Sequence, residues 1–78
     1  MDALDRAIQN WGRGLVKHHL GYYPISLSVE RQDNLSKNWV TAMAKLDKRQ
    51  FSLAFHFHQE GDKIALLGQM ITEKASPL

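Results

Sequence analysis

The sequence contains no cysteine, only two prolines and no long apolar run. Without cysteine there can be no disulfide framework and no thiolate zinc site, and a reducing compartment fits this composition. No apolar stretch approaches the roughly 20 residues that a membrane-spanning helix needs. The N-terminus, Met1-Asp2-Ala3-Leu4-Asp5, lacks the basic region of a signal peptide. We therefore expect a cytoplasmic protein that does not contact a membrane.

The chain is short, with 78 residues, and a chain of this length forms one hydrophobic core. We expect a single domain over residues 1–78. Domains near this size bury only about 60% of the surface that the unfolded chain exposes, which makes a water-excluding reaction pocket hard to build. The sequence therefore predicts a protein that acts by binding a larger molecule, and not an enzyme.

The clearest secondary-structure pattern lies at the start of the chain. Its apolar residues recur at spacings of four, three and four, which places them on one helical stripe: Leu4, Ile8, Trp11 and Leu15. Asp2 can cap this helix and Gly21 can end it. The pattern predicts a helix over residues 2–19.

A second apolar stripe follows a break at Pro24. It consists of Trp39, Val40, Met43 and Leu46, and it predicts another helix, which Asp33 or Asn34 would cap. Before it, residues 25–29 alternate apolar and polar side chains, as in a short strand or an extended connection.

The last third of the chain has two interpretations. Phe51, Leu53, Phe55 and Phe57 alternate with small or polar residues, and a turn at residues 60–62 precedes the apolar run 64–67, which together are typical of a β-hairpin. The helical interpretation begins at a capping box formed by Asp47 and Gln50, ends at Gly61 and starts a further helix at Asp62. Local alternation slightly favours the hairpin.

Residues that could catalyse a reaction or bind a metal are present without a recognisable arrangement. The four histidines, His18, His19, His56 and His58, have no cysteine partners and no carboxylate at a ligand spacing. No serine lies between the glycines of a nucleophile elbow. We expect no catalytic residue, no bound metal and no cofactor.

Six basic residues are arranged more regularly. Arg6, Arg13 and Lys17 fall within about 40° of one another on the first predicted helix, opposite its apolar stripe. Lys37, Lys45 and Lys48 gather on the far side of the second predicted helix. Two positive ridges of this kind are suited to phosphates or to an acidic protein. The alternative is an ordinary solvated surface.

The order of landmarks resembles that of phage Q-type late-gene antiterminators. The similar elements are Asn10-Trp11-Gly12-Arg13, then Leu20-Gly21-Tyr22 with Pro24, the run 40–46, and the run 53–61 with its histidines and closing glycine. The last run is also similar to region four of sigma factors. The resemblance implies helices over residues 40–46 and 53–61, and a regulator that contacts RNA polymerase or nucleic acid near a promoter. Ten residues, 69–78, follow Gly68, so a full DNA-reading helix barely fits there.

The expected fold is therefore mainly α, a small helical bundle of four to five short helices, with α+β and a hairpin over about residues 50–70 as the alternative. The expected function is that of a small phage-type transcription regulator, antiterminator-like, which acts in the host cytoplasm by occupying host RNA polymerase, DNA or both. The alternative function is a phage-encoded inhibitor that blocks a host enzyme or defence complex. The apolar segment Phe51 to Phe57 is the surface expected for a homodimer.

Overall fold

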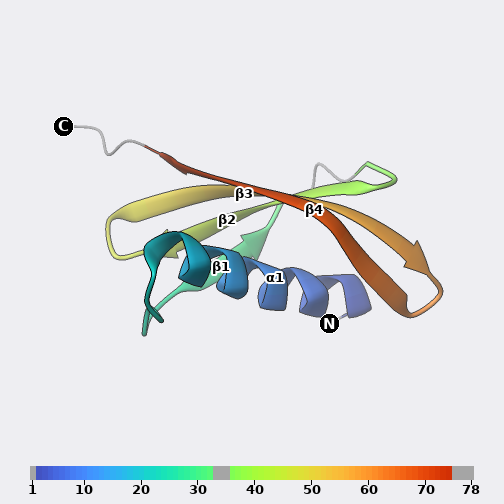
Figure 1. Ribbon diagram of the computed structural model, residues 1–78, viewed down its shortest axis with the longest axis horizontal. Coiled ribbons are helices and arrows are strands. Elements are labelled where there is room, and N and C mark those ends of the chain that lie inside the picture. Colours follow the sequence, from blue (N-terminus) through green and yellow to red (C-terminus); the bar gives the residue numbers. More distant parts are fainter. Residues whose placement is uncertain (1, 33–35, 75–78) are drawn as a thin grey trace.

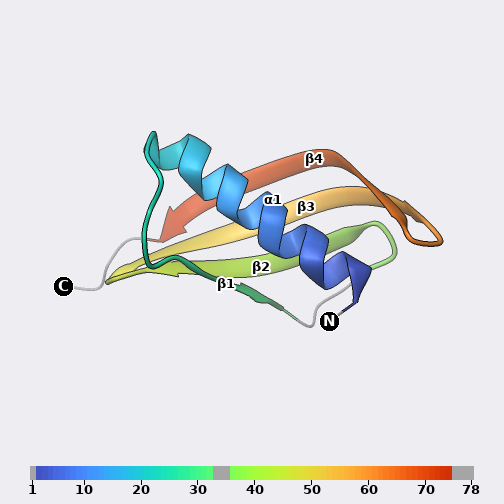
Figure 2. The ribbon, with the colours of Figure 1, turned by 90° about the horizontal axis from the view of Figure 1, so that it is seen from below.

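The computed structural model describes residues 2–32 and 36–74. Within these residues one helix precedes four strands: α1 (Ala3–Leu20), β1 (Ser28–Arg31), β2 (Trp39–Leu46), β3 (Arg49–Glu60) and β4 (Lys63–Lys74). The strands form an antiparallel sheet in the order β1-β2-β3-β4. Figure 1 shows α1 against one face of this sheet, and Figure 2 shows it crossing that face diagonally. No helix or strand of the described residues covers the opposite face.

Helix α1 agrees with the prediction from the sequence. The carboxylate of Asp2 accepts a hydrogen bond from the backbone N–H of Asp5 at 2.7 Å, which satisfies a donor that the first helical turn leaves free. Gly21 ends the helix in the left-handed conformation, with φ of 82°, and its N–H donates to the carbonyl of Lys17 at 2.8 Å. The apolar stripe faces the sheet and the basic side chains opposite it face solvent.

The core lies between α1 and one face of the sheet. Successive residues of a strand point to opposite faces, so every second residue of β2 and β3 is buried beneath the helix. These buried residues are Val40, Ala42, Ala44 and Leu46 on β2, and Phe51, Leu53, Phe55 and Phe57 on β3. Leu4, Ile8, Leu15 and Val16 of the helix belong to the same cluster, as do Leu27 and Val29.

The expected helical bundle is wrong, because the sheet occupies residues 28–31 and 39–74. The second apolar stripe, with Trp39 and Met43, belongs to β2. Asp47 lies in the β2–β3 turn and Gln50 in β3, while Gly61 and Asp62 form the β3–β4 turn. The helices that the antiterminator resemblance implied over 40–46 and 53–61 are these same strands. The alternative, a hairpin over about 50–70, corresponds to β3 and β4.

A physical reason favours strands over residues 39–46. A helical stripe through Trp39, Val40, Met43 and Leu46 would leave Ala42 and Ala44 away from the core, whereas the strand buries both of these alanines. The strand also pairs its backbone with β1 on one side and β3 on the other, and such pairing cannot be read from a local window of sequence. The proposed capping residues Asp33 and Asn34 lie outside the described residues.

Two further expectations are corrected. The short strand expected at residues 25–29 begins only at Ser28, and Ile25 is fully exposed. The homodimer surface expected at Phe51 to Phe57 is not available, since the phenylalanines of this segment lie beneath α1 and are at most 3% exposed. Among the described residues, no helix is both long enough and apolar enough to cross a membrane.

Gly12 sets how closely α1 approaches the sheet. A Cβ atom at this position would lie 2.9 Å from Cγ1 of Val29 and 3.3 Å from Cδ1 of Leu53, so only a residue without a side chain fits. Polar contacts hold the N-terminal half of the helix to β1. The side-chain amide of Gln9 donates to the carbonyl of Val29 at 2.7 Å, and Arg31 lies 3.6 Å from Asp2 and 3.7 Å from Asp5.

Two glycine substitutions separate packing from helix propensity. Gly12→Ala inserts a methyl group into a filled contact and should lower the free energy of unfolding by about 1–2 kcal/mol, because overpacking outweighs the gain in propensity. Gly14→Ala meets no atom within 4 Å and should raise it by about 0.5–1 kcal/mol. Urea unfolding followed by circular dichroism measures both, and equal effects in the two variants would contradict the close approach at Gly12.

Candidate functional site

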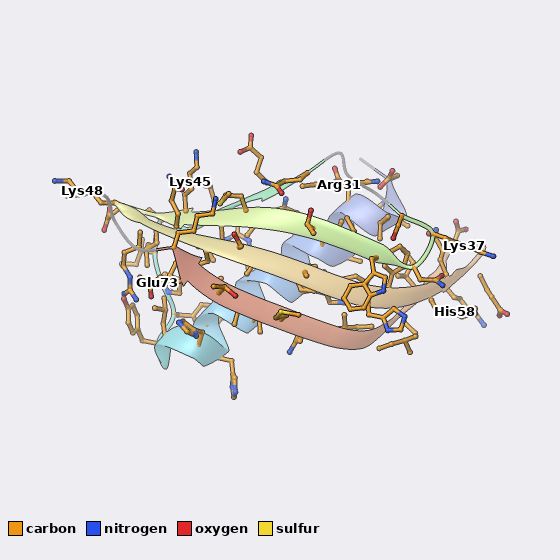
Figure 3. All side chains as sticks on the ribbon, turned by 90° about the horizontal axis from the view of Figure 1, so that it is seen from above. Arg31, Lys37, Lys45, Lys48, His58 and Glu73 are labelled. Atoms are coloured by element: carbon orange, nitrogen blue, oxygen red, sulfur yellow. The ribbon has the colours of Figure 1, made fainter. Side chains whose placement is uncertain are left out.

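The candidate site is the face of the sheet that α1 does not cover, called the open face here. Its side chains alternate with the buried ones: Ser28 and Glu30 on β1; Trp39, Thr41, Met43 and Lys45 on β2; Gln50, Ser52, Ala54, His56 and His58 on β3; and Ala65, Gly68, Met70, Thr72 and Lys74 on β4. Figure 3 looks directly onto this face, with α1 behind the sheet.

One end of the open face carries an aromatic stack. Trp39 and His56 are directly opposite each other in the β2–β3 register, and their rings lie 4.7 Å apart between centroids with only 11° between the planes. Trp39 is 45% exposed. The next residue in the same row is Gly68 on β4, which places no side chain beside His56. His56 is partly buried. A nearly parallel pair of rings that includes an exposed ring is a surface on which another planar group can stack.

The middle of the open face is low and nearly uncharged. The two rows beside the stack consist of Thr41, Ala54 and Met70, and then of Met43, Ser52 and Thr72. The small side chains of these rows leave a shallow depression of about 220 Å³, whose lining includes Thr41, Ser52, Ala54 and Thr72 together with the longer side chain of Met70. Glu30 is opposite Met43, on the strand farthest from β4.

The other end of the open face is cationic. Lys45, Gln50 and Lys74 form one row across β2, β3 and β4, and Lys48 extends from the adjoining turn. Figure 3 shows Lys45 and Lys48 together at this end. Lys45 is six positions beyond Trp39 along β2, which corresponds to roughly 20 Å at about 3.4 Å per residue. The open face therefore joins an aromatic end to a positively charged end through a neutral middle.

A clasp on the helix side holds the cationic end in place. Arg49 donates two hydrogen bonds to the carboxylate of Glu73, at 2.7 and 2.8 Å, and Nε2 of His19 on α1 lies 3.8 Å from the same carboxylate. Both Arg49 and His19 also contact the ring of Phe51. The clasp ties the start of β3, the end of β4 and the end of α1 together, and it fixes the backbone next to Lys74.

The six basic residues predicted from the sequence do not form one surface. Lys45 and Lys48 lie at the cationic end of the open face, and Lys37 lies at the opposite end, near His58 (Figure 3). Arg6, Arg13 and Lys17 are exposed on α1, behind the sheet. Lys17 is also engaged locally, with its ammonium nitrogen 4.2 Å from the ring centre of Tyr23. The expected second helical ridge is wrong, because Lys45 lies on β2, Lys48 in the β2–β3 turn and Lys37 in the loop before β2.

The four histidines lie in separate surroundings. His18 and His19 are at the end of α1, His56 stacks on Trp39, and Nε2 of His58 lies 3.6 Å from Glu60. Within residues 2–32 and 36–74, no three His, Cys, Asp or Glu side chains are grouped as a metal ion would require.

The exposed edge of the sheet adds apolar surface beside the stack. β4 is an edge strand, and the β3–β4 register shifts between His56 and Phe57, so Leu67 is an extra residue opposite this point. Leu67 and Met70 are each 59% exposed and lie on either side of Gly68. A register shift of this kind re-aims side chains at a strand edge.

The Trp39–His56 pair is the feature that sequence reasoning missed. The signal was the turn at Asp47 and Lys48, because a two-residue turn there fixes every pair in the β2–β3 hairpin. Counting outward from Leu46 opposite Arg49 gives Trp39 opposite His56.

The fold and this surface together define a small α+β domain with one sheet face uncovered. No protein-family model, no curated protein and no solved structure matches the chain.

The clasp should make stability depend on pH. The hydrogen bonds from Arg49 lower the pKa of Glu73 below its usual value of 4.5, so the ionised carboxylate stabilises the fold above that value. This contribution is lost as the pH falls through the lowered pKa. In Glu73→Gln the fall of the melting temperature below about pH 4.5 should be shallower than in the unaltered protein. Glu30→Gln, which removes the same charge elsewhere, should keep the full slope.

Proposed function

We propose that this protein binds nucleic acid across the open face of its sheet and acts by occupancy, as a small phage-type transcription regulator in the host cytoplasm. The observation that carries the proposal is the combination of an exposed aromatic stack and a lysine row on one uncovered surface. Aromatic rings stack with bases, and lysines neutralise phosphates. A four-stranded sheet bearing aromatic side chains is one of the established ways in which proteins bind RNA.

The composition of the open face supports this proposal. A sheet face that serves only to meet water usually carries charged or polar side chains, whereas this face presents Trp39, Met43 and Met70. Three of its lysines, Lys45, Lys48 and Lys74, gather at one end. The neighbouring side chains are mostly small, so a bound strand can pass over them. The mechanism requires no bond to be made or broken, since a bound molecule is simply covered.

The proposal predicts that the sheet lysines, and not the helix arginines, determine affinity. Replacing Lys45 and Lys74 by alanine should weaken binding of labelled DNA and reduce the slope of log K against log salt by about 1.4, at about 0.7 for each phosphate contact on a single strand. The control replaces Arg6 and Arg13 by alanine, which removes the same charge from α1. Its affinity should stay close to that of the unaltered protein.

Fluorescence anisotropy at several salt concentrations measures both double variants. Loss of binding in the helix variant with retention in the sheet variant would place the contact on α1 instead. Absence of any salt-dependent binding by the unaltered protein would remove nucleic acid as the ligand.

A protein target is the second candidate function, and the exposed apolar side chains of Leu67 and Met70 favour it. Methionine and leucine at an uncovered edge are typical of contacts with other proteins. Met70→Glu should abolish capture of a host complex from a bacterial lysate, whereas Arg13→Glu should not. RNA polymerase subunits in the captured material would support the regulator, and a different host complex would support the phage-encoded inhibitor.

A further inference from the structure

We infer that the nucleic acid is a single unpaired strand, and that one of its bases stacks on His56 in the space above Gly68. This inference rests on the proposed function and specifies its ligand. It follows from the geometry of the aromatic row, from the width of the sheet and from the placement of the lysines.

The Trp39–His56 stack has a free face at Gly68. Residues opposite one another on neighbouring strands lie about 4.5–5.5 Å apart. Two rings that stack across this gap therefore have their planes roughly perpendicular to the line that joins the two residues. One face of His56 is against Trp39, and its other face therefore looks towards Gly68. A Cβ atom on Gly68 would lie 3.7 Å from Cβ of His56, which is ordinary contact distance. The space is thus open in the native chain, and a side chain placed there would fill it.

Apolar side chains flank this space. Leu67 and Met70 stand on either side of Gly68 along β4 and are largely exposed, and Met70 also lines the shallow depression. A base seated on His56 would cover part of both side chains. Their exposure beside an aromatic stack is the arrangement expected of a surface that receives a flat, weakly polar ring.

The width of the sheet argues against duplex DNA. Four strands spaced about 4.8 Å apart span roughly 14 Å between the outer strand axes before any side chain is added. The major groove of B-form DNA is about 12 Å wide and admits a helix or a two-stranded ribbon. The open face cannot enter it, and bases that are paired inside a duplex do not offer their flat faces to Trp39 or His56. A single strand can turn its bases outward to stack on such rings.

The stack and the lysine row mark the two ends of the path that the bound nucleic acid follows across the open face. Lys45 and Lys74 lie roughly 20 Å from the stack at the strand rise of about 3.4 Å. At about 3.4 Å per stacked nucleotide that distance corresponds to roughly six nucleotides, and to fewer when the bases are splayed apart. Thr41, Ala54 and Ser52 have short side chains and line the shallow depression between the two ends, so they do not block this path. Glu30, on β1, lies away from a path over β3 and β4.

Trp39 provides a direct probe of the stack. In a Trp11→Phe background, Trp39 is the remaining tryptophan, so its fluorescence reports only on the open face. Oligonucleotides of about twelve residues, single-stranded and duplex, are titrated in ribose and deoxyribose forms. We expect the single strands to quench Trp39 and to bind at least about tenfold more tightly than duplexes of the same sequence.

The filling variant is Gly68→Val, which blocks the space without altering either ring. It should weaken single-strand binding about tenfold, the effect expected for loss of one stacked base. Ala65→Val is the matched control, since it adds the same kind of bulk on β4 opposite His58 and outside the stack. Valine is well suited to strands, and thermal unfolding verifies that both variants are folded.

The outcomes separate the inference from the proposed function. Duplexes that bind as tightly as single strands, or a Gly68→Val protein that binds like the unaltered one, would overturn the inference. Binding of duplex that still depends on Lys45 and Lys74 would leave the proposed function in place. Failure of every oligonucleotide to bind would overturn both.

Discussion

Four side chains of β3, those of Phe51, Leu53, Phe55 and Phe57, leave the strand on the same side and fill the space beneath α1. Burial of each such side chain stabilises the fold by about 1.5–3 kcal/mol, so this contact determines which face of the sheet is covered. The helix approaches closely because Gly12 has no side chain to hold it away from Val29 and Leu53. The caps, the turns and the polar contacts to β1 all align the helix over this one face.

A fold with a single helix covers one face of its sheet and leaves the other to solvent. α1 has 18 residues, which gives a length of about 27 Å at 1.5 Å per residue, comparable with the strands it crosses. Among the described residues, α1 is the layer on one face of the sheet, and no element covers the open face. Its stacked rings and methionines lie where water alone would favour charged groups, and this contrast is the basis of the functional proposal.

Charge is divided between the two sides of the molecule. Arg6 and Arg13 face solvent from α1, while Lys45 and Lys74 belong to the open face. At a Debye length of about 8 Å under physiological salt, charges on opposite sides of a two-layer domain act independently. The two groups of cations therefore have to be considered as separate surfaces, and only the sheet group lies beside aromatic rings.

Local sequence was sufficient where the interactions are local. The α1 helix, its Asp2 cap and its Gly21 stop follow from contacts within four residues, and the basic side chains of Arg6 and Arg13 face away from the apolar stripe as predicted. The alternation from Phe51 to Phe57 indicated a strand, and this indication was correct. The resemblance to antiterminators favoured helices in the same region, and the strands there show that local alternation was the better guide.

The sequence by itself determined the first helix and its two caps, because these depend on neighbours along the chain. It favoured a strand from Phe51 to Phe57 by local alternation but did not decide between strands and helices for the last third. The tertiary structure decided that residues 39–46 are a strand, since their apolar spacing suits either period and only pairing with β1 and β3 selects one. It also decided which cations share a surface and brought Trp39 onto His56. Trp39 and His56 are 17 positions apart in the chain, and the register of the β2–β3 hairpin brings them together. No short window of sequence contains both residues.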